Sequence, residues 1–289
     1  NKLGVANLTA QLMEKGTANK SVSDLEDAIA QLGASISFNS SKESFRISGT
    51  TLSKNYEKTL ALAKEMLLEP RWDKDEFELI KKRTISNLRQ QKGNPNAIAR
   101  NQYNKLIYGE NNIRSKNIAG TIESVSSITL EDVKSYYTDY ISPKVSTMHV
   151  VGSLPKDDIL SSLSSISSEW TGNEITIPEY KTPNAPKKGT VYFYDVPNAK
   201  QSVLNFGRPA LSVNDEDFYA ANVMNYRLGG GGFASQLTQQ LREGKGYTYG
   251  IRSRFSATKA KGTFTISSGV RSNVTLEASQ LVKSILENY

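Results

Sequence analysis

The chain has 289 residues, a formal net charge of +7 and an isoelectric point near 9.3. Its single histidine and the absence of cysteine exclude disulfide bonds, thiol catalysis and a zinc site built from several imidazole or thiolate ligands. No run approaches the roughly 18 apolar residues of a membrane span, and the basic clusters at 81–83 and 187–188 lack interleaved aromatic residues. We therefore expect neither a membrane span nor nucleic-acid binding.

The first half of the chain alternates predicted helices with short strands. Ser23 and Glu26 form a predicted capping box for a helix that closes at Gly33. Pro70 ends one helix, and Pro95 suits the first turn of another. In chain order we predict strands at 34–39 and 44–51, helices at 60–67, 73–91 and 95–107, a helix capped by Thr129, a strand at 145–151 and a serine-rich helix.

Residues 171–189 are rich in proline and form a predicted linker between two domains at 1–170 and 190–289. Strand pairs that alternate with groups of helices indicate an α+β fold with mainly antiparallel sheets, in which the second half repeats the first. Both ends lack helix start or stop signals, so we expect a trimmed chain that lacks the start of the first domain and the end of the second. After the linker we predict strands at 190–196 and 201–207, a helix at 215–228, four glycines, a helix at 233–243, strands at 248–256 and 262–269, and a terminal helix.

Asn7 and Gln11 have the four-residue spacing that places a pair of metal ligands on one face of a helix. Their neutral amides do not compete with water for Zn²⁺, and the methyl group of Ala10 cannot accept a proton. The frame from Gly4 to Thr17 resembles the zinc-binding helix of the M16 (pitrilysin / mitochondrial processing peptidase) peptidases, where Gly-x-Ala-His-x-x-Glu-His precedes a short apolar run and Gly-Thr.

In that family a glutamate ligand follows 76 residues after the second histidine, and the same ungapped count from Gln11 reaches Asn87. The intermediate segment Leu32-Gly33-Ala34 also falls where the family places it. The resemblance implies that all three ligands and the catalytic base have been replaced, at Asn7, Gln11, Asn87 and Ala10. We therefore expect no metal or other cofactor in this chain.

The second half contains the run Gly229, Gly230, Gly231 and Gly232, followed by Leu241-Arg242-Glu243 and Tyr249. This arrangement resembles the glycine loop and the Leu-Arg-Glu-x-x-Gly-x-x-Tyr signature of M16 proteins, although Gly244 replaces a charged or bulkier residue. The resemblance implies a LuxS/MPP-like metallohydrolase fold and substrate-binding roles for Arg242, Tyr249 and the loop. From the residues alone, Arg242 could instead cap a helix C-terminus and Tyr249 could be an ordinary strand aromatic.

Two other sequence features are weak candidates for a functional site. His149 lies in an apolar predicted strand and lacks the partners that a metal site needs, so it is expected to be a packed or edge histidine and not a ligand. Gly229, Gly231 and Ala234 fit a dinucleotide fingerprint loosely, but a helix precedes them where that motif needs a strand.

Together these features favour a zinc-free subunit of a two-chain peptidase. It would supply Arg242, Tyr249 and one wall of a chamber to a homologous partner that carries His-x-x-Glu-His, zinc and the catalytic activity on a peptide substrate. The alternatives are a structural subunit, like the core subunits of respiratory complexes, and a module that binds peptides without cleaving them. The bacterial two-chain members of the family imply a periplasmic or envelope location, with the mitochondrial matrix as the alternative.

Overall fold

The structure is a computed structural model that describes residues 2–178, 188–257 and 260–289. The chain forms two compact units, one of residues 1–90 and 116–179 and the other of residues 91–115 and 180–289. Each unit combines helices with one antiparallel sheet, which confirms the predicted α+β class. Most of the predicted linker, at 179–187, lies outside the described residues. The domain boundaries at 170 and 189 stay a prediction.

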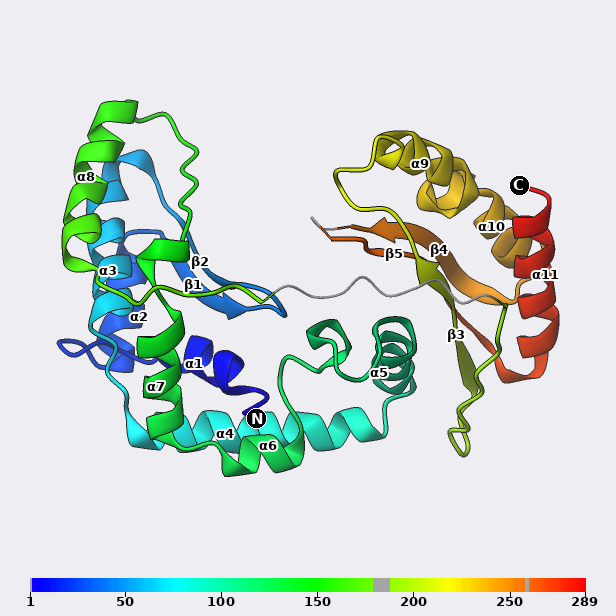
Figure 1. Ribbon diagram of the computed structural model, residues 1–289, viewed down its shortest axis with the longest axis horizontal. Helices are drawn as coiled ribbons and strands as arrows, with labels where there is room; N and C mark the ends of the chain where they lie inside the picture. Colours follow the sequence, from blue (N-terminus) through cyan, green and yellow to red (C-terminus); the bar gives the residue numbers. More distant parts are fainter. Residues whose placement is uncertain (1, 179–187, 258–259) are drawn as a thin grey trace. The chain divides into compact units, whose positions relative to one another are not determined.

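The first unit is mainly helical and contains one two-stranded sheet (Figure 1). In this sheet β1 (Ser35–Ser40) pairs antiparallel with β2 (Phe45–Thr50). Its helices are α1 (Val5–Met13), α2 (Val22–Gln31), α3 (Tyr56–Leu68), α4 (Lys74–Lys92), α6 (Ile122–Ser127), α7 (Leu130–Tyr140) and α8 (Lys156–Glu169). The last two residues of α4 belong to the second unit.

Side-chain caps set the starts of these helices. The Ser21 hydroxyl accepts a hydrogen bond from the Asp24 N–H at 3.2 Å, and the Asp24 carboxylate accepts from the Ser21 N–H at 3.3 Å. The prediction that Ser23 and Glu26 form this capping box was therefore wrong by two residues. Thr129 caps α7 as predicted, since its hydroxyl accepts from the Asp132 N–H.

Helix α1 contributes side chains to two hydrophobic clusters, which determines which of its residues are buried. Leu8 and Leu12 pack into one cluster with Phe77 and Ile80 of α4. Ala10 belongs to the other cluster, together with residues of α1, α2, α3 and β1, namely Met13, Leu25, Met66 and Phe38. Burial on two sides leaves only one narrow stripe of α1 for polar side chains.

The second unit is built on a three-stranded antiparallel sheet with the strand order β3-β5-β4 (Figure 1). Helices α9, α10 and α11 lie along one side of the sheet, and α5 packs against β3. The elements are α5 (Pro95–Tyr108), β3 (Gln201–Pro209), α9 (Phe218–Asn225), α10 (Gln236–Thr238), β4 (Thr248–Ser256), β5 (Thr263–Arg271) and α11 (Thr275–Glu287).

Alternation along the strands gives this sheet one apolar and one polar face. Ile251 and Ile266 are buried against Leu237, Leu241 and the α11 residue Val282. On the other side, the Tyr103 hydroxyl of α5 lies 2.6 Å from the Thr265 hydroxyl of β5. Because this bond joins residues 162 positions apart, the sequence did not indicate that α5 belongs to the second unit.

Two predicted strands are absent from the described residues. The segments 145–151 and 190–196 pair with no other described segment, and Val151 and Val191 are 101% and 94% exposed. An apolar run predicts a strand only if another strand completes its backbone hydrogen bonds. His149 consequently lies exposed in an irregular segment, so the expectation that it is a packed or edge histidine of a strand was wrong.

Candidate functional site

The polar stripe of α1 carries the two amides that stand at the predicted metal-ligand positions. Asn7 and Gln11 are partly buried, and the Gln11 Nε2 donates to the Asn7 Oδ1 at 2.7 Å. The same nitrogen lies 3.4 Å from the Asn7 backbone carbonyl. The structure therefore brings these two residues together, but their side chains bind each other.

Ala10 and Asn87 do not complete a metal site. Ala10 is 1% exposed and lies in an apolar cluster with Met13 and Leu25, an environment in which a charged carboxylate is costly to bury. Asn87 is exposed on α4 and forms no hydrogen bond with Asn7 or Gln11. Within the described ranges no group of three or more His, Cys, Asp or Glu side chains could hold a metal ion. The residues at these positions do not fit zinc.

Glu14, one turn after Gln11, has a structural role that the sequence analysis missed. Its Oε1 accepts a hydrogen bond from the Phe38 N–H at 2.6 Å, which ties α1 to β1. Burial raises the pKa of the Glu14 carboxyl, although this hydrogen bond and the nearby Lys15 ammonium act in the opposite direction. The signal in the sequence is limited to an acidic residue directly after the apolar pair Leu12-Met13.

In the second unit, the glycine run lies a few residues after the end of α9. The helix continues as a π-helical turn at Tyr226–Gly230, so the predicted helix at 215–228 has different bounds and geometry. A Cβ atom on Gly229 would meet the Ser253 hydroxyl and would lie 2.7 Å from a methyl of Leu237. Gly232 has φ +61°, a conformation that L side chains rarely adopt. Close packing and backbone conformation therefore require glycine at both positions.

Buried polar side chains attach this glycine loop (Gly229–Gly232) to strand β4. Asn225 donates to the Ser253 carbonyl at 3.0 Å and accepts a hydrogen bond from the Ser253 hydroxyl. The Thr238 hydroxyl donates to the Ile251 carbonyl at 3.4 Å and accepts from Ser235. Because each group is buried and has a partner, this network holds the loop rigidly. The sequence analysis did not identify these residues.

Arg242 lies in a second π-helical segment, Gln239–Gly244, which replaces the end of the predicted helix at 233–243. Its guanidinium lies 4.4 Å from the centre of the Phe233 ring, and its Nε is 3.6 Å from the Glu243 carboxylate. The side chain donates to no helix carbonyl among the described residues. Stacking on Phe233 restricts the plane of the guanidinium while N–H donors remain accessible.

Tyr249 follows Arg242 by seven residues and lies in the irregular first part of β4, between Thr248 and Ile251. Its side chain is 88% exposed, and its phenol has no hydrogen-bond partner in the described part of the chain. The neighbouring Thr248 hydroxyl lies 2.7 Å from the Gly269 carbonyl and 2.9 Å from the Gly250 carbonyl, which fixes the bulge after Thr248. Arg242 and Tyr249 thus both leave donors free, but their side chains make no hydrogen bond or ring contact with each other.

Comparison with known proteins identifies the family. Residues 127–289 match the family profile described as "Peptidase M16 inactive domain", and residues 1–120 match "Insulinase (Peptidase family M16)". The chain belongs to peptidase family M16. This confirms the resemblance that the sequence motifs carry.

Two curated bacterial relatives differ in their names. "Uncharacterized zinc protease YmxG" of Bacillus subtilis is 23% identical over 98% of this chain and 68% of its own length. "Non-peptidase homolog YmxG" of Helicobacter pylori is 25% identical over 89% of this chain and 59% of its own length. The chain thus spans about three fifths to two thirds of these relatives.

Solved structures share the fold. A peptidase M16 inactive domain from Pseudomonas fluorescens superposes with a TM-score of 0.89 and 25% identity, over 100% of this chain and 70% of that one. A protease from Helicobacter pylori gives a TM-score of 0.82 at 20% identity, over 98% of this chain and 68% of that one. No helix among the described residues is long and apolar enough to cross a membrane.

Proposed function

We propose that this chain is the zinc-free subunit of a two-chain M16 peptidase. The observation that carries the proposal is the hydrogen bond between the Gln11 and Asn7 amides on α1, because it occupies the two metal-ligand positions with a self-satisfied pair. In the second unit, by contrast, Arg242 and Tyr249 have donors that no described residue engages. A homologous partner with an intact His-x-x-Glu-His would bind zinc and cleave the peptide.

In this role Arg242 and Tyr249 bind the substrate backbone. A guanidinium presents fixed N–H donors to a peptide carbonyl, and a phenol donates to an oxygen that gains negative charge. The glycine loop positions Arg242 indirectly, since Phe233 follows Gly232 and stacks on the guanidinium. The name "Non-peptidase homolog" of the Helicobacter pylori relative supports a non-catalytic role.

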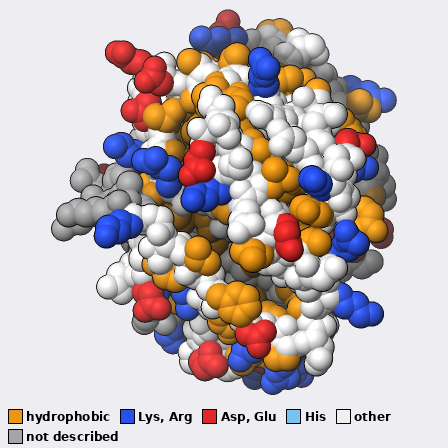
Figure 2. All heavy atoms as spheres, turned by 90° about the vertical axis from the view of Figure 1, so that its right-hand side faces the viewer, with side chains coloured by type: hydrophobic (Ala, Val, Ile, Leu, Met, Phe, Trp, Pro, Cys, Tyr) orange, Lys and Arg blue, Asp and Glu red, His pale blue; other side chains and the backbone are white. Residues whose placement is uncertain are grey.

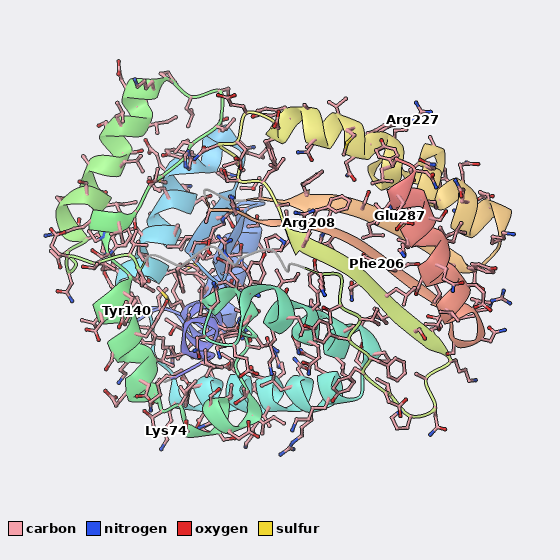
Figure 3. All side chains as sticks on the ribbon, turned by 45° about the vertical axis from the view of Figure 1, so that its right-hand side comes forward. Lys74, Tyr140, Phe206, Arg208, Arg227 and Glu287 are labelled. Atoms are coloured by element: carbon pink, nitrogen blue, oxygen red, sulfur yellow. The ribbon has the colours of Figure 1, made fainter. Side chains whose placement is uncertain are left out.

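The experiment mixes the purified chain with its sister subunit and follows the cleavage of a fluorogenic peptide. We expect no hydrolysis by this chain alone, hydrolysis by the pair, and a rate roughly 100-fold lower with Arg242→Ala, the usual cost of one lost transition-state donor. Tyr249→Phe keeps the ring and removes only the hydroxyl. Arg208→Ala is the matched control, because Arg208 is an exposed arginine of the same unit on β3 (Figure 3).

The outcome separates the proposal from its alternatives. Zinc-dependent hydrolysis by this chain alone would contradict it. If the Arg242→Ala and Tyr249→Phe variants activate the sister subunit as well as the wild type does, the chain is a structural subunit. Peptide binding without any effect on a sister subunit would identify a module that captures peptides.

A further inference from the structure

The polar face of the β3-β5-β4 sheet carries an unusual set of side chains. The strand register pairs Arg252 with Ser267, Arg254 with Thr265, and Arg271 with Gln201. Ser267, Thr265 and Arg271 alternate along β5 with the buried Ile266 and Val270, so these pairs share the face opposite the hydrophobic core. Thr265 is buried beneath Tyr103 of α5, so the accessible part of this face consists of Arg252, Arg254, Ser267 and Arg271. We call these four residues the basic sheet face.

No acidic side chain accompanies these arginines on the strands. The segments of β3, β4 and β5 contain four arginines and no Asp or Glu, and α5 adds Arg100 and Lys105 without an acid. Arg252, Arg254 and Arg271 are exposed and form no ion pair with any described residue. The acidic residues among the described residues of this unit lie elsewhere, at Glu110, Asp195, Asp215, Glu216, Asp217, Glu243, Glu277 and Glu287.

The other side of this unit has a different charge pattern. Figure 2 shows acidic and basic side chains mixed among hydrophobic ones on the face that carries α11. There Lys283 pairs with Glu287 at 3.5 Å, as on an ordinary solvated helix. The basic composition of the whole chain therefore does not explain why the sheet carries arginines without acidic residues. Unpaired charges of one sign attract a ligand of the opposite sign.

The spacing of the arginines selects the shape of that ligand. Arg252 and Arg254 are two residues apart on β4, which corresponds to roughly 6.6 Å along a strand. An extended peptide has the same repeat between alternate side chains. One end of the face lies beside Tyr249. The residue before Tyr249, Thr248, pairs with Val270, and Val270 is next to Arg271 in β5.

We infer that the basic sheet face binds extended peptides that carry acidic side chains at alternate positions. This inference rests on the proposed function, which makes the ligand a peptide. Tyr249 donates to the peptide near one end of the face, and Arg252 and Arg254 pair with successive acidic residues along β4. The substrate class of the two-chain peptidase is then acidic, extended segments.

The experiment measures the binding of fluorescein-labelled twelve-residue peptides to the whole chain by anisotropy. One peptide alternates Glu with Ser, and two others replace every Glu by Gln or by Lys. At low salt we expect the Glu peptide to bind at least about tenfold more tightly than the Gln peptide, and the Lys peptide not to bind. The preference should shrink at high salt, because exposed charges are screened.

The variant Arg252→Glu/Arg254→Glu/Arg271→Glu should abolish the preference for the Glu peptide. Arg208→Glu is the matched control, because Arg208 pairs with Phe264 and so belongs to the opposite face of the same sheet. If the triple variant does not fold, the triple Arg→Gln variant removes the charges without adding repulsion and should bind the Glu and Gln peptides equally.

Equal binding of all three peptides would overturn the inference. So would an equal loss of Glu-peptide binding in Arg208→Glu, or tighter, arginine-dependent binding of a twelve-nucleotide single-stranded RNA. Activation of the sister subunit on a neutral peptide without any acidic preference contradicts this inference alone. Arginine-dependent binding of the Glu peptide without activation contradicts only the two-chain proposal.

Discussion

Helix α1 and the region around Arg242 use polar side chains in opposite ways. On α1, Gln11 donates to Asn7, and the position between them, Ala10, is packed against apolar neighbours. In the second unit, Arg242 stacks on Phe233 and retains accessible N–H donors, and the exposed Tyr249 phenol has no partner among the described residues. A buried polar group with an internal partner adds stability but has little capacity left to bind a ligand, whereas an accessible one retains it.

The same contrast separates buried, hydrogen-bonded polar residues of the second unit from exposed ones that we propose bind a ligand. Asn225, Ser253 and Thr238 are buried and fully engaged in holding the glycine loop on β4. Arg252, Arg254 and Arg271 are exposed and unpaired among the described residues. Burial and the number of hydrogen-bond partners, more than residue type, are therefore our criteria for telling side chains that support the fold from those that we propose bind a ligand.

The largest expected effect tests whether the Ala10 position is now part of the core. Ala10→Glu places a carboxylate in the cluster with Met13 and Leu25, so we expect a loss of roughly 3–5 kcal/mol in the free energy of unfolding, measured by urea denaturation at pH 7. Ala61→Glu is the control, on the exposed side of α3. If a variant with His at 7 and 11 and Glu at 10 and 87 bound zinc stoichiometrically at wild-type stability, this interpretation of α1 would be wrong.

A smaller effect is expected where the glycine loop meets β4. Gly229→Ala drives a methyl group into the Ser253 hydroxyl and the Leu237 side chain, and overpacking of this kind costs about 1–3 kcal/mol. We expect a lower thermal midpoint, together with reduced activation of the sister subunit. Gly152→Ala, where an added Cβ meets nothing within 4 Å, should leave both unchanged. Similar midpoints for the two variants would show that the loop is not held as described.

The smallest effect concerns Glu14 and depends on pH. Because burial raises its folded pKa, the native state disfavours the ionised carboxyl, and stability should rise as the pH falls through this pKa toward the unfolded value near 4.5. Glu14→Gln keeps an oxygen acceptor for the Phe38 N–H. At pH 7 it should be neutral or stabilising by less than about 1 kcal/mol, and this gain should disappear at pH 3.5. A marked loss of stability at pH 7 would contradict the prediction.

Much of the fold could be predicted because it depends on neighbours in sequence. Thr129 caps α7 by bonding three residues ahead, and strand β4 occupies 248–256 as predicted. Such signals lie within a few residues, so the sequence carries them directly. The M16 family and the amides at Asn7 and Gln11 were also evident from short motifs, and the match to the family profiles confirmed the family.

The sequence by itself thus determined many of the local elements, the family, and the presence of amides at Asn7 and Gln11, the predicted ligand positions. Only the tertiary structure decided that α5 joins the second unit, through the Tyr103 and Thr265 hydroxyls, and that Arg271 shares a face with Arg252 and Arg254. It also decided that 145–151 and 190–196 form no strand among the described residues. The physical reason is that strand register and helix packing depend on contacts between residues far apart in the chain, which no local pattern encodes.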